Sequence, residues 1–177
     1  LRARLNLGNK KVVLGVAQPW TIRKGYQDML NLANLLPHDS FQVILVGLTE
    51  KQIDSLPKNI LGVKRTNSQE ELSEYYSLAS VFVNPTYEDN FPTTNLEALA
   101  CGTPVITYNT GGSPEAIDSD TGRVIDKGDI NSLIGTIGIL TSFDREKIRQ
   151  YCRSRATSLF NKDDRYADYI QLYHSLI

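Results

Sequence analysis

The stretch "SVFVNPTYEDNFPTTNLEALACGTPVITY", residues 80 to 108, contains the alternation that decides the fold. It predicts a buried strand over 80–85, a helix over 91–101 that ends at Gly102, and a second buried strand over 104–108. A strand, a helix and a strand in such close succession indicate two parallel strands joined by a right-handed crossover.

The same alternation extends in both directions along the chain. Further strands are expected over 11–17, 41–47, 58–64 and 122–125, and further helices over 23–36, 68–79, 129–142, 144–160 and 163–174. Alternating strands and helices are typical of a parallel sheet with helices on both faces. The predicted fold class is therefore α/β, a three-layer Rossmann-like domain with a mainly parallel six-stranded sheet.

Composition excludes several classes of function. The 177 residues carry a formal net charge of -1, so no basic field points to nucleic acid or to an anionic membrane. No apolar run reaches the roughly 18 residues of a transmembrane helix. The chain begins at Leu1 and its only methionine is Met29, so we expect an excised domain or a processed chain.

Neither the cysteines nor the histidines suggest a metal centre. Cys101 and Cys152 match neither a zinc nor a redox spacing and are expected to be reduced, buried thiols, as in a reducing compartment. His38 and His174 lie outside the loops where a ligand is expected, and we assign them no chemistry.

The helix within 91–101 is unusually apolar and yet contains Glu97. On a helical wheel Asn95 is the one clearly outward polar residue, and the main apolar arc consists of Leu96, Leu99 and Ala100. A carboxylate on a largely buried helix is costly unless it is paired or faces a ligand. Glu97 is therefore either bonded to a neighbouring segment or an acceptor for the adjacent hydroxyls of a ribose.

The start of this helix favours a bound phosphate. Pro92 suits a first helical turn, and the amides of Thr93 and Thr94 have no partner within the helix. Asp89, on the loop that enters the helix, is either a turn-forming residue or a contact for the group attached to that phosphate.

The segments "DNFPTTNLE", "ALACGTPVI" and "TGGSPE" resemble the C-terminal domain of family-4 retaining glycosyltransferases, the glycosyl transferases group 1. That family carries two acids separated by seven residues, and the similarity extends over most of residues 11 to 135. The resemblance implies the C-terminal half of a GT-B fold, with residues 1–177 as one nucleotide-sugar-binding domain. Residues 1–10 would enter from a missing N-terminal acceptor domain, and the helices over 144–177 would pack back on it.

The resemblance also assigns roles to residues. Lys24 would neutralise the donor's diphosphate, Asp89 would lie near the donor sugar, and Glu97 would bind the ribose, so these three are the catalytic candidates. The other donor-binding candidates are Gly15, Lys64, Arg65, Asn90, Phe91, Thr93 and Thr94, with the base expected near 63–66. Lys64 and Arg65 could equally be surface charges.

This sequence departs from the family pattern at several positions. The first acid is Asp89 instead of glutamate, which leaves its neighbour Glu88 as an alternative. A frequent arginine after the first strand is missing, so the second diphosphate cation is absent or comes from Arg23. Trp20 is expected to pack the first loop, and the glycines of "NTGGSP" form either a simple turn or a close approach to sugar or acceptor.

The activity implied is hexosyl transfer, with retention, from a nucleotide-diphosphate sugar to a saccharide or lipid-linked acceptor in polysaccharide biosynthesis. No cofactor and no metal are implied, and the fragment alone should be inactive. A sugar-nucleotide epimerase and a nucleotide-binding regulatory module are the alternatives. The implied location is cytoplasmic, with peripheral contact at the inner face of the membrane through the missing domain as an open alternative.

Overall fold

The structure is a computed structural model that describes residues 1–176. Its centre is a six-stranded sheet with the order β3-β2-β1-β4-β5-β6, in which every neighbouring pair is parallel. The strands are β1 (Lys11–Val16), β2 (Phe41–Val46), β3 (Ile60–Val63), β4 (Val81–Asn84), β5 (Val105–Tyr108) and β6 (Gly122–Ile125). The predicted α/β fold class and its six strands are confirmed.

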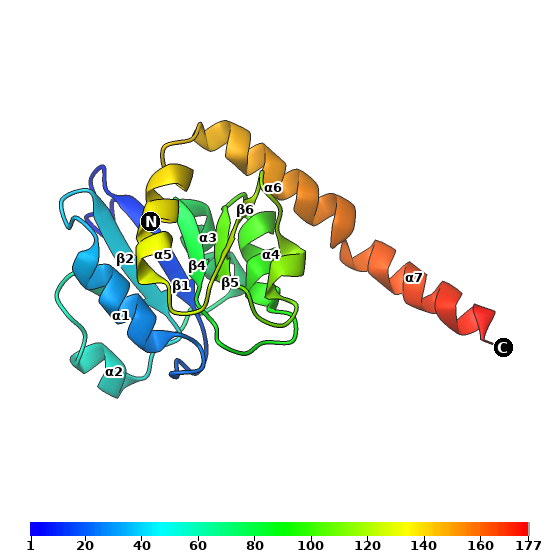
Figure 1. Cartoon of the computed structure of the whole chain (residues 1–177), viewed down its shortest axis with the longest axis horizontal. Coiled ribbons are helices and arrows are strands. Elements are labelled where there is room, and N and C mark those ends of the chain that lie inside the picture. The colour runs from blue at the N-terminus through cyan, green and yellow to red at the C-terminus, as the bar shows by residue number, and fades with distance from the viewer. Residues whose placement is uncertain (177) are drawn as a thin grey trace.

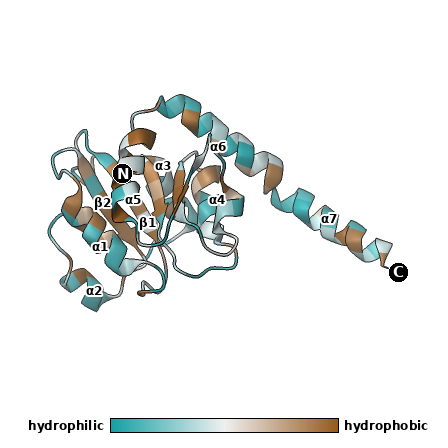
Figure 2. Ribbon diagram, viewed as in Figure 1, coloured by the Kyte–Doolittle hydropathy of each residue, from teal (hydrophilic) through white to brown (hydrophobic). Residues whose placement is uncertain are grey.

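Helices cover both faces of this sheet (Figure 1). They are α1 (Tyr26–Leu35), α2 (Glu50–Asp54), α3 (Gln69–Leu78), α4 (Thr93–Ala100), α5 (Ile130–Leu140), α6 (Arg145–Leu159) and α7 (Lys162–Ser175), with a 3-10 turn η1 (Ser113–Ala116). Helix α1 packs beside α5 on one face, and α4 packs beside α3 and α6 on the other. Figure 2 shows the hydrophobic strands enclosed between helices whose outer surfaces are mostly hydrophilic.

The strands form because their side chains are buried on both faces of the sheet. Residues 43–46 of β2 and 12–15 of β1 are buried without interruption, as are all four residues of β4 and of β5. Parallel sheets covered on both sides require such continuous apolar runs instead of an alternating pattern. The sheet thereby fixes the position of every loop that leaves its carboxyl edge.

The structure corrects two predictions for α4. Asn95 is fully buried instead of outward, since Asn84 Nδ2 donates to its Oδ1 at 2.9 Å and its own Nδ2 donates to the Ser113 carbonyl at 3.3 Å. Ala100, expected in the apolar arc, is exposed. The helix is rotated relative to the hydrophobic prediction because a buried asparagine pair, which a hydrophobicity pattern cannot reveal, holds it against β4.

The remaining differences between the predicted and the observed secondary structure concern short elements and the ends of helices. Helix α1 begins at Tyr26 instead of residue 23. Gly25, its N-cap residue, adopts a left-handed conformation with φ of 73°, which is not helical, so the helix cannot start earlier. Neither α2 nor η1 was expected; α2 is five residues long and has no buried side chain to produce a periodic signal.

The last two helices differ in how they pack on the domain. Helix α6 packs against α4 through its buried residues Ile148, Cys152 and Ala156, so it is part of this domain. Helix α7 has no buried residue and projects away from the domain at the red end of Figure 1. Packing of α7 on another domain stays a prediction, and Ile177 lies outside the described residues.

Both cysteines are free thiols, as expected. Cys152 is buried, which raises the pKa of its thiol to about 12. Cys101 is only half-buried, contrary to the prediction, because it lies at the exposed end of α4.

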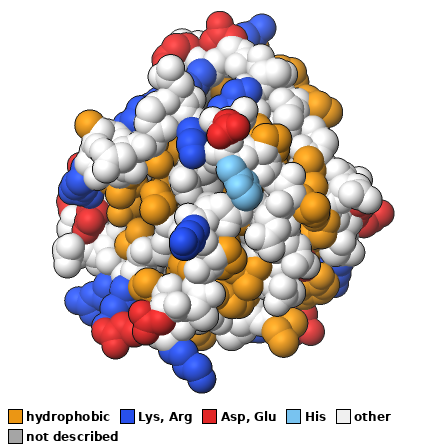
Figure 3. All heavy atoms as spheres, turned by 90° about the vertical axis from the view of Figure 1, so that its left-hand side faces the viewer, with side chains coloured by type: hydrophobic (Ala, Val, Ile, Leu, Met, Phe, Trp, Pro, Cys, Tyr) orange, Lys and Arg blue, Asp and Glu red, His pale blue; other side chains and the backbone are white. Residues whose placement is uncertain are grey.

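The surface gives no sign of a single-sign charge patch on the face that carries α1 and α2. Figure 3 shows basic, acidic and apolar side chains interspersed there. No helix among residues 1–176 is long and apolar enough to cross a membrane.

Candidate active site

The candidate site lies where the strand order reverses. Strands β1 and β4 are neighbours in the sheet although β2 and β3 separate them in the chain. In doubly wound sheets the crevice beyond the carboxyl ends of such a strand pair is where ligands bind. Lys24 lies on the segment that follows β1 and Asp89 on the segment that follows β4, so both border this crevice.

Lys24 and Asp89 form an ion pair across the crevice. The Lys24 Nζ lies 2.6 Å from the Asp89 Oδ2, and the two side chains are only 25% and 17% exposed. Glu88, the alternative first acid, is exposed, and its carboxylate forms no hydrogen bond or ion pair with any residue from 1 to 176. The structure therefore brings Asp89, and not Glu88, to the predicted phosphate lysine.

Backbone contacts hold these two segments together. A Cβ on Gly25 would lie 2.2 Å from the Pro85 carbonyl oxygen, so only glycine allows α1 to begin this close to β4. The Tyr87 amide donates to the Arg23 carbonyl at 2.8 Å. The ion pair thus joins two segments that are already fixed to each other.

Asp28 of α1 is a buried carboxylate close to these two segments. Its Oδ2 accepts hydrogen bonds from the hydroxyls of Tyr87 at 2.9 Å and Tyr108 at 2.6 Å. Burial, with the added effect of the Asp28 carboxylate, raises the pKa of both tyrosines, which keeps the hydroxyls protonated as donors. Sequence reasoning missed Asp28, although an acid next to Met29 on the buried face of α1 is the same signal that singled out Glu97.

The double glycine of residues 109–114 makes room for the chain itself. A Cβ on Gly111, which has φ of 48°, would lie 1.8 Å from the Asp89 carbonyl oxygen. The Gly112 amide donates to the Asn90 carbonyl at 2.8 Å. These glycines therefore allow the chain to pack closely against the loop that carries Asp89.

Helix α4 begins without a side-chain cap. Pro92 is its N-cap residue instead of part of the first turn, and no acid lies in that turn. The amides of Thr93 and Thr94 donate to no acceptor in the described part of the chain, and Thr93 is exposed. Free amides at a helix start attract an anion, with a dipole contribution of roughly 0.3–1 kcal/mol. This start follows the Asp89 loop directly.

Glu97 is bonded to a neighbouring helix, which is one of its two predicted roles, and ribose binding stays a prediction. Its Oε2 accepts a hydrogen bond from the Tyr76 hydroxyl of α3 at 2.9 Å, and burial together with the Glu97 charge raises the pKa of Tyr76. Its Oε1 has no partner among residues 1–176, and the residue is only half-buried. The tyrosine therefore orients the carboxylate while one oxygen stays available for a hydroxyl donor.

Other predicted residues lie apart from this cluster. Gly15 is buried in β1, where a Cβ would meet the Trp20 ring at 2.9 Å, and Trp20 packs the first loop as predicted, donating from Nε1 to the Val46 carbonyl at 2.8 Å. Lys64 and Arg65 follow the edge strand β3 and are exposed, and Lys64 pairs with Glu50 at 2.5 Å.

Two further candidates lie on the loop that enters α4, and neither side chain forms a hydrogen bond with Lys24 or Asp89. Asn90 is exposed and Phe91 packs near Phe160 with 6.1 Å between ring centroids. His38 binds Asn59 instead of any site residue. Within residues 1–176, no group of three or more His, Cys, Asp or Glu side chains could hold a metal ion.

Comparison with known families identifies the chain. Residues 1–158 match the model of the family "Glycosyl transferases group 1". The chain belongs to this family. The match spans every strand of the sheet and the whole Lys24, Asp89 and Glu97 region.

Two named relatives are bacterial glycosyltransferases. The chain is 28% identical over 180 residues to the GDP-mannose-dependent alpha-(1-6)-phosphatidylinositol monomannoside mannosyltransferase of Mycolicibacterium smegmatis, covering 91% of this chain and 46% of the relative. It is 25% identical over 181 residues to the capsular polysaccharide biosynthesis glycosyltransferase CapM of Staphylococcus aureus, covering 96% and 47%. The chain thus spans about half the length of these relatives.

Solved structures share the fold. Sucrose-phosphate synthase of Thermosynechococcus elongatus matches with a TM-score of 0.82 at 28% identity, over 99% of this chain and 48% of that one. HepE of Anabaena, solved with UDP-glucose, matches at 0.81 and 20% identity over 98% and 51%. The solved C-terminal domain of the group 1 glycosyl transferase LpcC of Francisella tularensis matches at 0.72 and 20% identity over 90% and 91%.

Proposed function

We propose that this chain is the donor-binding half of a retaining glycosyltransferase, which transfers a hexose from a nucleotide-diphosphate sugar to a saccharide or lipid-linked acceptor. The observation that carries the proposal is the Lys24–Asp89 pair, 2.6 Å apart across the β1–β4 crevice and beside the uncapped start of α4. A cation and free helix amides favour a diphosphate, and an acid next to them favours hydroxyls.

Each residue of the cluster has a role in this proposal. The diphosphate binds between Lys24 and the amides of Thr93 and Thr94, which stabilise negative charge as the nucleoside diphosphate departs. Asp89, released from Lys24, accepts from hydroxyls of the donor sugar. Glu97, oriented by Tyr76, accepts from the ribose hydroxyls.

The names of similar proteins support a nucleotide-sugar donor. One relative is GDP-mannose-dependent and one structural neighbour was solved with UDP-glucose. The proposal needs no cofactor or metal, because Lys24 and the helix start supply the positive charge. Capsular polysaccharide synthesis, in which a relative acts, is the proposed setting, in the cytoplasm.

The acceptor site belongs to a second domain in this proposal. Residues 1–10 would connect to it, and α7, which has no buried residue, would return to it. The fragment alone then binds the donor without transferring its sugar.

Calorimetric titration with UDP, GDP and ADP tests the proposal. We expect one nucleotide to bind, and Glu97→Ala to weaken it about tenfold or more, since at least one charge-assisted hydrogen bond of roughly 1.5–3 kcal/mol is lost. Glu97→Gln should retain part of the affinity, because its amide oxygen still accepts from Tyr76. Glu74→Ala, an exposed acid on the neighbouring helix α3, serves as the control.

Two outcomes would contradict the proposed site. Unchanged affinity in Glu97→Ala would reduce Glu97 to a structural partner of Tyr76. Absence of heat for all three nucleotides at millimolar concentration would remove the donor site from this chain.

A further inference from the structure

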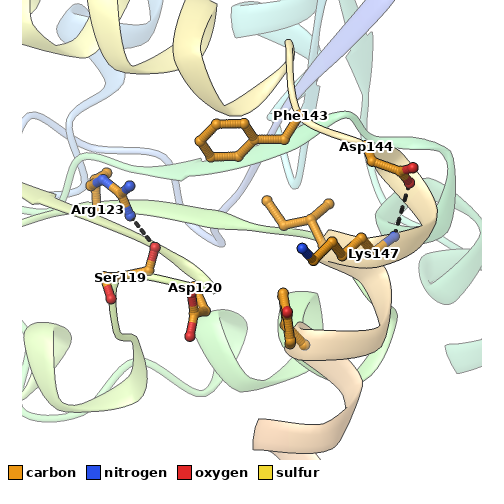
Figure 4. Close-up of a pocket in the computed structure, with 8 residues that line it drawn as sticks. Ser119, Asp120, Arg123, Phe143, Asp144 and Lys147 are labelled. Atoms are coloured by element: carbon orange, nitrogen blue, oxygen red, sulfur yellow. Dashed lines mark hydrogen bonds between the residues drawn. The ribbon is translucent and has the colours of Figure 1, made fainter.

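A hollow of about 560 Å³ lies between the segment that enters β6 and the first turns of α6 (Figure 4). This volume is within the range of known ligand pockets. Six residues around it carry the argument: Asp120, Arg123, Phe143, Lys147, Ile148 and Tyr151. In Figure 4 the Phe143 ring borders the hollow opposite Asp120, and Arg123 and Lys147 lie on its two sides.

A second hollow of about 250 Å³ continues the first along α6. The two share Asp120 and Tyr151, and the second extends past Ser154 to Leu159. Tyr151 therefore stands between two adjoining spaces. We call the two hollows together the α6 groove.

The first hollow of the α6 groove is separate from the donor site. Asp120 precedes β6, so the first hollow lies at the amino ends of the strands. Lys24 and Asp89 follow β1 and β4 and lie at the carboxyl ends, which form the opposite edge of a parallel sheet.

Charge in the first hollow is balanced. Arg123 and Lys147 are matched by Asp120 and Asp144, and several of these groups already have local partners. Asp144 caps α6 by accepting from the Lys147 amide at 3.0 Å, and the Arg123 guanidinium donates to the Gly122 and Ser119 carbonyls. In the second hollow Arg155 pairs with Asp118 at 2.6 Å. Phosphate, nucleic acid and anionic lipid are therefore disfavoured, and a neutral polar ligand is favoured.

The aromatic side chains indicate which class of neutral polar ligand the groove would bind. Phe143 and Tyr151 line the hollow and are 47% and 43% exposed, so both rings are accessible to a ligand. A sugar ring has an apolar face of C–H groups, which suits an aromatic ring, and an edge of hydroxyls. The Asp120 carboxylate, which accepts no hydrogen bond and forms no ion pair within residues 1–176, and the Lys147 ammonium are suited to those hydroxyls.

We propose that the α6 groove binds a neutral oligosaccharide, with one sugar on each side of Tyr151. Two adjoining hollows divided by one ring fit a chain of repeating rings better than a single compact molecule. The proposal goes beyond donor binding, because the first hollow lies at the edge of the sheet opposite the nucleotide. Its function would be to hold a saccharide chain on the enzyme.

Amide NMR spectra of the ¹⁵N-labelled chain, titrated with neutral hexasaccharides of glucose, mannose and galactose in turn, test this proposal. We expect at least one of them, at millimolar concentration, to shift amides in residues 119–123 and 143–159. Tyr151→Ala should weaken that binding at least about tenfold, which corresponds to about 1.4 kcal/mol.

Tyr166→Ala is a matched control within the same chain. Lys162 lies 5.5 Å from the Tyr166 ring centroid on α7, just as Lys147 lies 5.9 Å from the Tyr151 ring centroid on α6. Tyr166 is even more exposed, at 58%, but lines neither hollow. It should leave saccharide binding unchanged, and the spectra also show whether each variant is folded.

Three results would overturn the proposal. They are absence of shifts with all three neutral hexasaccharides, an equal loss of binding in Tyr151→Ala and Tyr166→Ala, and binding of an oligogalacturonate but of no neutral saccharide. None depends on the donor site, because no nucleotide is present. Nucleotide titration of the same sample tests the proposed function separately.

Discussion

Replacing Lys24 with alanine is expected to weaken the binding of a nucleoside diphosphate by about 100-fold, or about 2.7 kcal/mol. The variant loses a charge-assisted hydrogen bond to the diphosphate, a contribution of about 1.5–3 kcal/mol. It also leaves the Asp89 carboxylate, now without its partner at 2.6 Å, facing an anion. Both effects act in the same direction, so a loss near the upper end of this range is expected.

Calorimetry with the nucleotide that the wild type prefers measures this loss. Lys127→Ala is the control, because this exposed lysine follows β6 at the same edge of the sheet and its removal changes the net charge equally. Lys24→Arg should retain part of the affinity. An affinity in Lys24→Ala within twofold of the wild type, or an equal loss in Lys127→Ala, would show that Lys24 does not contact the diphosphate.

Replacing Asp89 with asparagine is expected to act in opposite directions on two ligands. In the empty site Asp89 neutralises Lys24, so a nucleoside diphosphate must displace this carboxylate before it can bind. Asparagine keeps the size of the side chain and removes its charge. Binding of the nucleoside diphosphate alone should therefore become about fivefold tighter, or about 1 kcal/mol, while the extra affinity that the attached sugar provides should disappear.

Paired titrations of the variant with the nucleoside diphosphate and with its sugar conjugate separate the two effects. Glu88→Gln, which alters the adjacent exposed acid, should change neither affinity. Weaker binding of the nucleoside diphosphate to Asp89→Asn would contradict the exchange of partners at Lys24. Loss of the sugar's contribution in Glu88→Gln instead would assign the first acid to Glu88.

Sequence alone predicts the sheet well because the strands are buried on both faces. The short apolar run over 41–47 does not have the periodicity of an amphipathic helix, so it is predicted as a buried strand. Gly102 and Pro104 mark the end of a helix and the start of the next strand. Helix α2 escapes prediction because all its residues are at least partly exposed. Asn95 escapes it because the partner that permits its burial, Asn84, is known only once β4 and α4 are packed.

The candidate site was predictable in part. The unusual position of Glu97 on an apolar helix and the predicted phosphate site at the start of α4 follow from local pattern, whereas the assignment of Lys24 and Asp89 to one site followed only from the family resemblance. The two residues are 65 positions apart, and nothing in either local sequence indicates the other. Asp28 was missed for a similar reason: its partners, Tyr87 after β4 and Tyr108 at the end of β5, are far from it in the sequence. The glycines at 111 and 112 signalled a close approach, but the pattern did not show that the approaching group is the chain itself.

The most direct measurement is the set of backbone amide shifts that a saturating nucleoside diphosphate produces in the ¹⁵N-labelled chain. The amides of Thr93 and Thr94, which lack acceptors in the described structure, should shift most, together with those around Lys24 and Asp89. Shifts confined to other parts of the surface, with Thr93, Thr94 and Lys24 unaffected, would contradict a donor site at the β1–β4 crevice.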